Sequence, residues 1–168
     1  FPTRVNANDP DLIAWLAGEM RRFGIVPEIE AVDVGHVFQA ATLHREGVLE
    51  RRPYVQFVMG VRNSMPADRA LFDFCVASVR RLFGSEAPWC AAGIGRHQAE
   101  VNAWAAAAGG HLRTGLEDNI RLDRHRLAPS NAALVERAVG IAADYDRRPA
   151  TPIEARAILG LAPVTAAA

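Results

Sequence analysis

Segments that read as β-strands alternate with segments that read as α-helices along this 168-residue chain, at intervals of roughly thirty residues. A first helix is followed by four strand–helix units and one extra helix. Such an alternation predicts parallel strands that are joined by right-handed helical crossovers. Half of the residues are hydrophobic, so a chain of this length can build one domain with a real core. The expected fold class is therefore α/β.

The elements are expected at specific ranges. Short apolar segments bounded by glycine, proline or charged residues predict strands at 25–34, 54–61, 88–95 and 109–119. Helical patterns are expected at 10–23, 36–48, 64–82, 97–108, 131–145 and 151–160. Apolar stripes predict the buried faces of two helices: Leu12, Ile13, Leu16, Met20 and Phe23 in the first, and Leu71, Phe74, Cys75, Ser78 and Leu82 in the third.

Among the predicted strand segments, the stretch 109–119 has the highest density of charged residues at its C-terminal end. Two glycines open it, and Arg113, Glu117 and Asp118 crowd its C-terminal end. Side chains alternate between the two faces of a strand, so Arg113 and Glu117 are expected on the same face. Asp118 has the opposite parity, and it reaches the same place only if the strand ends and the chain turns there.

A polar strand face must point into an enclosed space when both faces of a parallel sheet are covered, as in the interior and mouth of a barrel. Glu28 and Glu30 share one face of the strand at 25–34 and are expected to point the same way as Arg113. The unusual residues also gather at the C-terminal ends of the strands, which is the rule for open α/β sheets and for (β/α)8 barrels alike.

Four strand–helix units are half of the eight in a parallel (β/α)8 TIM barrel, which takes roughly 250 residues when complete. The chain begins with Phe1 rather than methionine, and residues 1–4 look like the middle of a pattern. We therefore expect residues 1–168 to form the C-terminal half of a single TIM-barrel domain, about the last four βα units plus a C-terminal helix. The N-terminal half is expected to precede this chain.

Charge and cysteine content narrow the expected partners. Lys plus Arg and Asp plus Glu each number 19, so no charge excess favours nucleic acid or an anionic membrane. No segment approaches the apolar length of a membrane span. The two cysteines, Cys75 and Cys90, form no CxxC pair and fit a reducing compartment. We expect small-molecule chemistry in the cytoplasm, with neither nucleic acid nor a membrane as partner.

Several motifs occur together in a specific order and spacing. They are Pro27-Glu28-Ile29-Glu30 with Asp33-x-Gly35-His36, Gly93-Ile94-Gly95-Arg96-x-Gln98, the run 109–119, Ser130-Asn131-Ala132, and Thr151-Pro152-x-Glu154-Ala155-Arg156-x-x-Leu159-Gly160-Leu161. This combination covers nearly all of the chain and resembles the C-terminal portion of the β-keto acid cleavage enzymes. The resemblance implies a zinc-dependent TIM barrel that exchanges acyl parts between a β-keto acid and acetyl-CoA, giving acetoacetate and a new CoA ester.

The resemblance also implies roles for individual residues. Glu117 matches the carboxylate ligand of the zinc ion, which works beside two histidines of a His-x-His pair on an early strand; no His-x-His occurs in this chain. Arg113 and Asp118 match the catalytic arginine and aspartate, and Glu30 matches an active-site glutamate. Members of the family look oligomeric and often tetrameric, so a homo-oligomer is expected.

These residue types suit the chemistry. Forming a carbon–carbon bond from acetyl-CoA requires an enolate, whose charge a divalent cation stabilises, and zinc accepts a carboxylate ligand such as Glu117. Asp118 would accept a proton next to a carbonyl, while Arg113 orients it or binds the substrate carboxylate. Gly95 and Arg96 are candidates for binding a CoA phosphate at the start of the next helix, although a tight turn also explains Gly95.

Other interpretations remain open. Arg113 and Glu117 would form a structural ion pair in a protein without this activity. The chain would also be a noncatalytic half-barrel if it must associate with its missing half to bind anything, since an isolated half leaves two sheet edges unpaired. A third alternative is another metal-dependent carbon–carbon lyase on the same barrel, which activity without CoA would favour.

Overall fold

The computed structural model describes residues 7–163, so residues 1–4, which led us to expect a preceding segment, lie outside the described range. The elements, in chain order, are α1 (Pro10–Arg22), β1 (Glu28–Ala31), α2 (Val34–Arg45), β2 (Tyr54–Met59), α3 (Arg69–Phe83), β3 (Trp89–Gly93), the 3-10 turn η1 (Gly95–His97), α4 (Gln98–Ala108), β4 (His111–Leu112), α5 (Asn131–Ala143) and α6 (Pro152–Ile158). The order and type of the elements agree with the prediction from the sequence.

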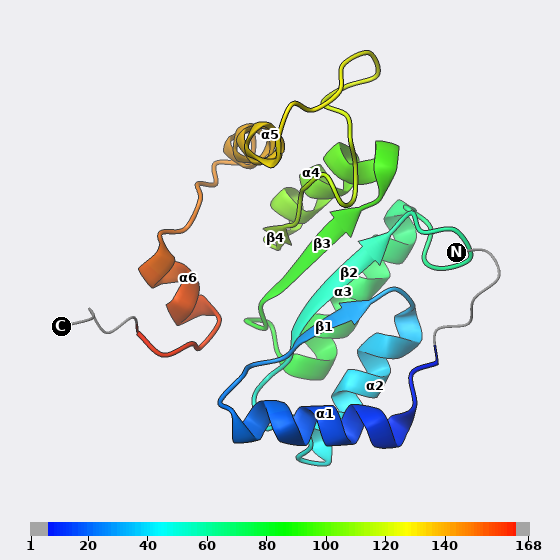
Figure 1. The fold of residues 1–168 in the computed structure, drawn as a ribbon, viewed down its shortest axis with the longest axis vertical. Coiled ribbons are helices and arrows are strands. Elements are labelled where there is room, and N and C mark those ends of the chain that lie inside the picture. The colour runs from blue at the N-terminus through cyan, green and yellow to red at the C-terminus, as the bar shows by residue number, and fades with distance from the viewer. Residues whose placement is uncertain (1–6, 164–168) are drawn as a thin grey trace.

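The four strands form one parallel sheet in the order β1-β2-β3-β4 (Figure 1). Each strand is connected to the next through a helix, and α2, α3 and α4 pack against one face of the sheet. The α/β class with parallel strands is therefore confirmed. Within the described residues, β1 and β4 each pair with one neighbour only, so the sheet has two open edges.

The core between the sheet and its helices is built on three large aromatic residues. Phe57 on β2, Phe72 on α3 and Trp89 on β3 have ring centroids 5.5 to 6.5 Å apart. A Cβ at Gly110 would lie 2.3 Å from ring atoms of Trp89, which explains why a glycine must stand there. The neighbouring Gly109 ends α4 in the left-handed conformation that glycine adopts most readily.

The opposite face of the sheet is polar. The register places Glu30 beside Gln56, Gln56 beside Cys90, and Cys90 beside His111, so these side chains form one row across the four strands. Glu28 and Glu30 lie on this face, as predicted. The sheet therefore has an apolar face, which the helices cover, and a polar face, which carries the candidate site residues.

The strand at the end of the sheet is much shorter than predicted. Only His111 and Leu112 of the expected strand 109–119 belong to β4, and the chain then turns. The inference that Glu117 faces the same way as Arg113 by strand alternation was therefore wrong. The strand expected at 25–34 is also reduced, to the four residues of β1.

The predicted buried face was wrong for α1 and only partly right for α3, where Cys75 and Ser78 are buried and Leu71 and Leu82 pack against the core. In α1 only Ala17 is buried, and Leu12, Leu16 and Phe23 of the predicted stripe are exposed. The exposed side of α1 also includes Trp15, which is 60% exposed. In α3 the buried side chains are Phe72, Cys75, Val76, Ser78, Val79 and Phe83, whereas Phe74 is exposed. Both helices carry apolar residues on more than one side, so periodicity alone did not select the buried one.

The predicted starts of α1 and α6 are confirmed, whereas α2 begins two residues earlier and α3 five residues later than predicted. Asp9 caps α1 by accepting hydrogen bonds from the backbone N–H groups of residues 11 and 12. Thr151 and Glu154 form the expected capping box at α6. Among the helices of residues 7–163, none is long and apolar enough to cross a membrane.

Candidate active site

The candidate site is organised by the side chain of Arg113, just beyond the end of β4. Its Nε and Nη2 donate to the two carboxylate oxygens of Asp118, each at 2.9 Å. Nη1 donates to Glu30 at 3.2 Å, and Nη2 lies 3.3 Å from the carboxylate of Glu117. The structure thus brings together all four residues that the sequence analysis placed at the catalytic and metal sites.

A turn, rather than a continuing strand, brings Asp118 to Arg113. The backbone N–H groups of Asp118 and Asn119 both donate to the carbonyl of Gly115, at 3.2 and 3.1 Å. The chain therefore reverses over residues 115–119, and Glu117 and Asp118 both end near Arg113. The expectation that Asp118 reaches the site only if the strand ends there is confirmed.

Arg113 and Asp118 form the buried part of the cluster. The side chain of Asp118 is 4% exposed and that of Arg113 is 24% exposed. Burial by itself would lower the pKa of Arg113, but the hydrogen bonds and charge of Asp118, together with Glu117 and Glu30, raise it overall. The guanidinium is therefore a fixed positive charge under all ordinary conditions.

Gln56 is a site residue that the sequence analysis missed. It is buried on β2, where its Oε1 accepts from Nη1 of Arg113 and its Nε2 donates to Glu28 at 2.6 Å. Partial desolvation of Glu28 raises the pKa of its carboxyl group, and the charge of Arg113 offsets part of this effect. A lone amide in the otherwise apolar run 54–59 was the available signal, because buried amides need hydrogen-bond partners.

The contact between Arg113 and Glu30 joins residues from opposite edges of the sheet. Neighbouring strands lie about 4.8 Å apart, so a flat sheet would separate β1 from β4 by roughly 14 Å. Extended arginine and glutamate side chains can span this separation, and the two meet at 3.2 Å over the polar face of the sheet. This polar face therefore forms one wall of the candidate site.

The turn that carries Glu117 and Asp118 is held in place by distant segments. Asn131, at the start of α5, accepts from the N–H of Leu116 at 2.8 Å, and the N–H of Gly95 donates to the carbonyl of Asp118 at 2.6 Å. Gln98, fully buried at the start of α4, donates to the carbonyl of Gly115 at 3.1 Å. The position of the two carboxylates thus depends on three separate elements.

Arg137 on α5 supports the same turn from its far side. It donates to the side-chain oxygen of Gln98 and to the carbonyls of Arg121 and Leu122, the last at 2.7 Å. Gln98 therefore donates to the carbonyl of Gly115 and accepts from Arg137, which in turn holds the carbonyls of residues 121 and 122. The sequence motif contained Gln98, but nothing in the pattern assigned a role to it or to Arg137.

Glu117, the predicted metal ligand, is 86% exposed. Its carboxylate is therefore free to reach a metal ion, and an oxygen ligand suits zinc or another divalent metal. Within residues 7–163, no three His, Cys, Asp or Glu side chains lie close enough together to hold a metal ion. The described residues fit one ligand of such a site, and the others would have to come from elsewhere.

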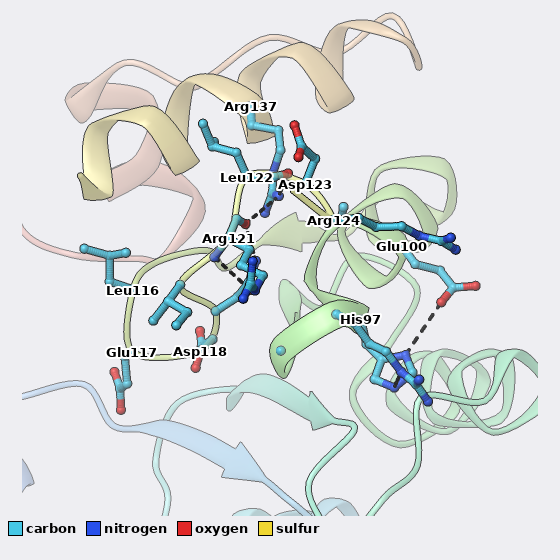
Figure 2. A pocket seen from close by; sticks show the side chains of 15 residues that line it. His97, Glu100, Leu116, Glu117, Asp118, Arg121, Leu122, Asp123, Arg124 and Arg137 are labelled. Atoms are coloured by element: carbon cyan, nitrogen blue, oxygen red, sulfur yellow. Dashed lines mark hydrogen bonds and ion pairs between the residues drawn. The ribbon is translucent and has the colours of Figure 1, made fainter. Parts of the chain in front are cut away.

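A cleft of about 850 Å³ opens beside this turn (Figure 2). Residues of the β3–α4 turn line one side, including Gly95 and Arg96, and the segment 116–124 lines the other. Glu117 and Asp118 belong to the lining, so the cleft reaches the candidate catalytic residues. Because the N–H of Gly95 is already used by Asp118, the side chain of Arg96 is the freer of the two predicted CoA-binding groups.

A comparison of the sequence with models of protein families gives a match. The family model described as "beta-keto acid cleavage enzyme" matches residues 1–161. The chain belongs to the β-keto acid cleavage enzyme family. The resemblance inferred from the motifs is thereby confirmed.

Three curated relatives with similar sequences are named for different substrates. A 3-oxoadipate:acetyl-CoA acetyltransferase of Cupriavidus necator is 50% identical over 161 residues, which are 96% of this chain and 56% of the relative. A 3-keto-5-aminohexanoate cleavage enzyme of Fusobacterium nucleatum is 39% identical over 82% of this chain and 48% of its own length. A 3-dehydrocarnitine:acetyl-CoA trimethylamine transferase of Rhizobium meliloti is 36% identical over 94% and 51%. The chain spans about half the length of these relatives.

A solved structure, the ternary complex of ObcA with a C4-CoA adduct and oxalate, has the same fold over the matched part. The TM-score is 0.74, with 19% sequence identity, and the match covers 92% of this chain and 41% of that chain. At this identity the likeness concerns the arrangement of the backbone. It supports the α/β fold with a parallel sheet.

Proposed function

We propose that this chain is the C-terminal half of a TIM-barrel enzyme that transfers acyl groups between a β-keto acid and acetyl-CoA, releasing acetoacetate and a new CoA ester. The observation that carries the proposal is the cluster of Arg113, Asp118, Glu30 and Glu117 at the C-terminal end of a parallel sheet. Active sites of (β/α)8 barrels lie at that end. The names of the relatives, which pair keto acids with acetyl-CoA, support the reaction class.

Each residue of the cluster has a task in this proposal. Asp118 accepts the proton that must leave a carbon next to a carbonyl, since a carboxylate in a desolvated place is a suitable base. Arg113 holds Asp118 by two hydrogen bonds. Its nitrogens also face Glu30 and Glu117, and an anionic substrate would accept hydrogen bonds from these same nitrogens. Glu30 borders the same space from β1 and would bind or orient the substrate.

We propose zinc as the metal and Glu117 as one of its ligands. When bound, the ion would polarise a keto or carboxylate oxygen of the substrate. The high exposure of Glu117 supports this role, because its carboxylate is free to turn toward an ion. Two histidines of a His-x-His pair would complete the ligands from the half of the protein that this chain does not include.

The half-barrel proposal rests on three observations. The parallel sheet has open edges at β1 and β4 in the described part of the chain, which a closed barrel would pair. The apolar side chains Leu12, Trp15 and Leu16 of α1 are exposed and would be covered by further elements. Finally, the chain spans about half the length of its relatives.

The proposal stops at the class of substrate. The relatives act on keto acids with different distal groups, according to their names, so the acid used here is left to experiment. A homo-oligomer, with a tetramer as the first state to test, and a cytoplasmic location stay predictions. The two cysteines of the described residues are free and buried, which suits a reducing compartment.

The test is the consumption of acetyl-CoA by the complete gene product with a panel of β-keto acids, with and without a strong chelator. We expect turnover with at least one acid and its loss when the metal is removed. Turnover that persists after removal of all metal would contradict the zinc proposal. Keto acid cleavage that does not require CoA would instead establish the alternative, a metal-dependent lyase on the same barrel.

A second candidate is a noncatalytic half-barrel, favoured by the same open sheet edges. It is tested by comparing residues 1–168 alone with the complete gene product. If the chain is half of a catalytic barrel, the fragment alone binds no zinc stoichiometrically and has no activity, whereas the complete protein has both. Activity in neither preparation, together with association of the fragment with another chain, would favour the noncatalytic half.

A further inference from the structure

The cleft beside the catalytic turn contains charged groups of both signs, but their pairing is uneven. Its carboxylates all have cationic or histidine partners: Asp118 and Glu117 lie 2.9 and 3.3 Å from Arg113, Asp123 lies 2.7 Å from Arg126, and Glu100 lies 3.8 Å from His97. Two of these partners, Arg113 and Arg126, lie outside the lining of the cleft. The charges of Asp118 and Asp123 are therefore paired from outside the lining, whereas Glu100 meets a histidine that is charged only when protonated and Glu117 stays largely exposed.

Three arginines of the lining have no such partner. Within the described part of the chain, Arg96, Arg121 and Arg124 form no ion pair with a carboxylate, and all three residues are exposed. Arg96 lies on η1, where its Nε donates only to the ring of the adjacent His97, and the other two lie on the segment after Asp118. Three guanidinium groups from two segments thus border one space.

The backbone that carries these groups is held in place. The carbonyl of Arg121 accepts from Nη1 of Arg137 and from the side-chain amide of Asn119, the latter at 2.6 Å. The N–H of Arg121 donates back to the side-chain oxygen of Asn119 at 3.1 Å. The start of the segment is therefore ordered without using the guanidinium of Arg121, which stays available to a ligand.

Unpaired guanidinium groups around an open cleft favour an anion with several oxygen atoms. Arginine binds phosphate groups with two parallel hydrogen bonds, and it is weakly hydrated compared with an ammonium group, so it releases water readily on binding. A cleft of about 850 Å³ lies within the usual range for small-molecule ligands. The ligand expected from these features is large and carries more than one phosphate.

We propose that Arg96, Arg121 and Arg124 bind the phosphate groups of acyl-CoA, the diphosphate and the 3′-phosphate, while the thioester end lies toward Asp118 in the same cleft. This inference rests on the proposed function for the identity of the ligand. It extends that function by placing the nucleotide in the cleft on one side of the catalytic turn, away from the polar face of the sheet. The two carboxylates of the turn then lie between the nucleotide cleft and the keto acid.

The first experiment compares two acyl donors in the complete gene product. Arg121→Ala/Arg124→Ala and Arg96→Ala are assayed with acetyl-CoA and with S-acetylpantetheine, which lacks all the phosphates. We expect KM for acetyl-CoA to rise at least tenfold while kcat/KM for S-acetylpantetheine changes less than twofold. Equal changes with both donors, or no change with acetyl-CoA, would overturn the proposal.

Arg45→Ala is the matched control, because it removes one exposed arginine from the last turn of α2 without touching the cleft. It should leave both kinetic constants within twofold of the original protein. Thermal unfolding of every variant checks that the fold is retained. A loss of acetyl-CoA affinity in the control as large as in the cleft variants would show a general charge effect and would overturn the assignment.

A binding measurement separates this proposal from the reaction itself. Isothermal titration with adenosine 3′,5′-bisphosphate, and separately with inorganic phosphate, needs no turnover. If the original protein fails to turn over acetyl-CoA, the proposed function fails, and binding of the bisphosphate that Arg121→Ala/Arg124→Ala weakens at least tenfold still supports a phosphate site. Binding that the variants leave unchanged, or no binding, overturns that site whatever the activity.

Discussion

Asp118 accepts hydrogen bonds from Nε and Nη2 of the same guanidinium, that of Arg113, and both donor–acceptor distances are 2.9 Å. This two-point contact fixes the plane of the carboxylate as well as its position. Asp118 lies on a turn, whose backbone is more easily displaced than a strand. The two hydrogen bonds from Arg113 therefore fix the orientation of Asp118, although its backbone lies on a turn.

The first prediction concerns the stability that this pair supplies. Arg113→Met leaves the buried Asp118 carboxylate without its cation, and we expect the free energy of unfolding of the complete protein to fall by about 2 kcal/mol. Fully buried pairs lose roughly 3–5 kcal/mol when broken, and partial exposure of Arg113 reduces the effect. Denaturant titration measures it. Arg113→Met/Asp118→Asn should lose less than the sum of the two single variants, and strict additivity would contradict the coupling.

The second prediction concerns catalysis by Asp118. An asparagine keeps the shape of the side chain but accepts no proton, so Asp118→Asn should lower kcat for acyl exchange by a factor on the order of 10² to 10⁴. The thermal midpoint should also fall, because the pair with Arg113 is broken, so kcat is measured well below that midpoint. Asp73→Asn, at an exposed carboxylate on α3, serves as the control and should retain full activity. A variant at 118 with undiminished kcat would mean that another group accepts the proton.

The third prediction concerns Gln98 as a positioning residue. Gln98→Leu removes the acceptor of Arg137 and the donor to Gly115, and a buried polar group left without a partner costs about 1–3 kcal/mol. We expect that loss in unfolding experiments, and a fall in kcat with a smaller change in KM, because the turn with Asp118 loses its support. Gln39→Leu on α2 is the control. Loss of stability with unchanged kcat would assign Gln98 a structural role only.

The fourth prediction concerns Gly93 at the end of β3. A Cβ there would lie 2.3 Å from the carbonyl oxygen of His97, a backbone atom that cannot rotate away. Gly93→Ala should therefore destabilise the protein by about 2 kcal/mol through overpacking. Gly140→Ala in α5 has free space around the new methyl group and should raise the free energy of unfolding by about 0.5–1 kcal/mol. Similar effects at both positions would contradict the close approach at Gly93.

The fifth prediction concerns the pH dependence of stability. Burial, and secondarily the charge of Arg147, lower the pKa of His111 below its usual value of 6.5. The unfolded chain therefore takes up a proton before the folded protein does, so stability is lost as the pH falls from 6.5 toward the lower folded value. Thermal unfolding of the complete protein at pH 7.5, 6.5 and 5.5 should show this loss.

A variant isolates the contribution of His111 to that profile. His111→Gln keeps a polar partner for the hydroxyl of Tyr54, which lies 3.0 Å from Nδ1 of His111, and should flatten the profile between pH 6.5 and 5.5. The neighbouring thiol does not interfere, since burial raises the pKa of Cys90 to about 11. An unchanged profile in His111→Gln would assign the pH dependence to other groups.

Much of the fold could be predicted because it depends on local signals. Asp9 with Pro10, the capping box at Thr151, and glycines at helix ends mark boundaries by chemistry that acts within a few residues. The polar face with Glu28 and Glu30 followed from the two-residue repeat of a strand. The family resemblance then supplied the roles of Arg113, Asp118 and Glu117, which spacing alone left open.

The remainder depends on contacts between distant parts of the chain. The turn at 115–119 is held by Gly95, Gln98 and Asn131, and no local pattern announces that these residues meet it. The expected strand was therefore too long. Phe74 was wrongly placed on the buried face of α3 because apolar residues surround much of this helix, and the sheet beneath selects which of them are covered.

Arg113 holds its two main carboxylates with unequal strength. Asp118 is buried and doubly bonded, whereas Glu30 is 57% exposed and meets the guanidinium through one nitrogen. An exposed pair contributes only about 0–1 kcal/mol, so an incoming carboxylate can replace Glu30 at little cost while Asp118 stays in place. One guanidinium thus has a permanent partner and an exchangeable one, and under the proposed function the substrate carboxylate would take the place of the exchangeable one.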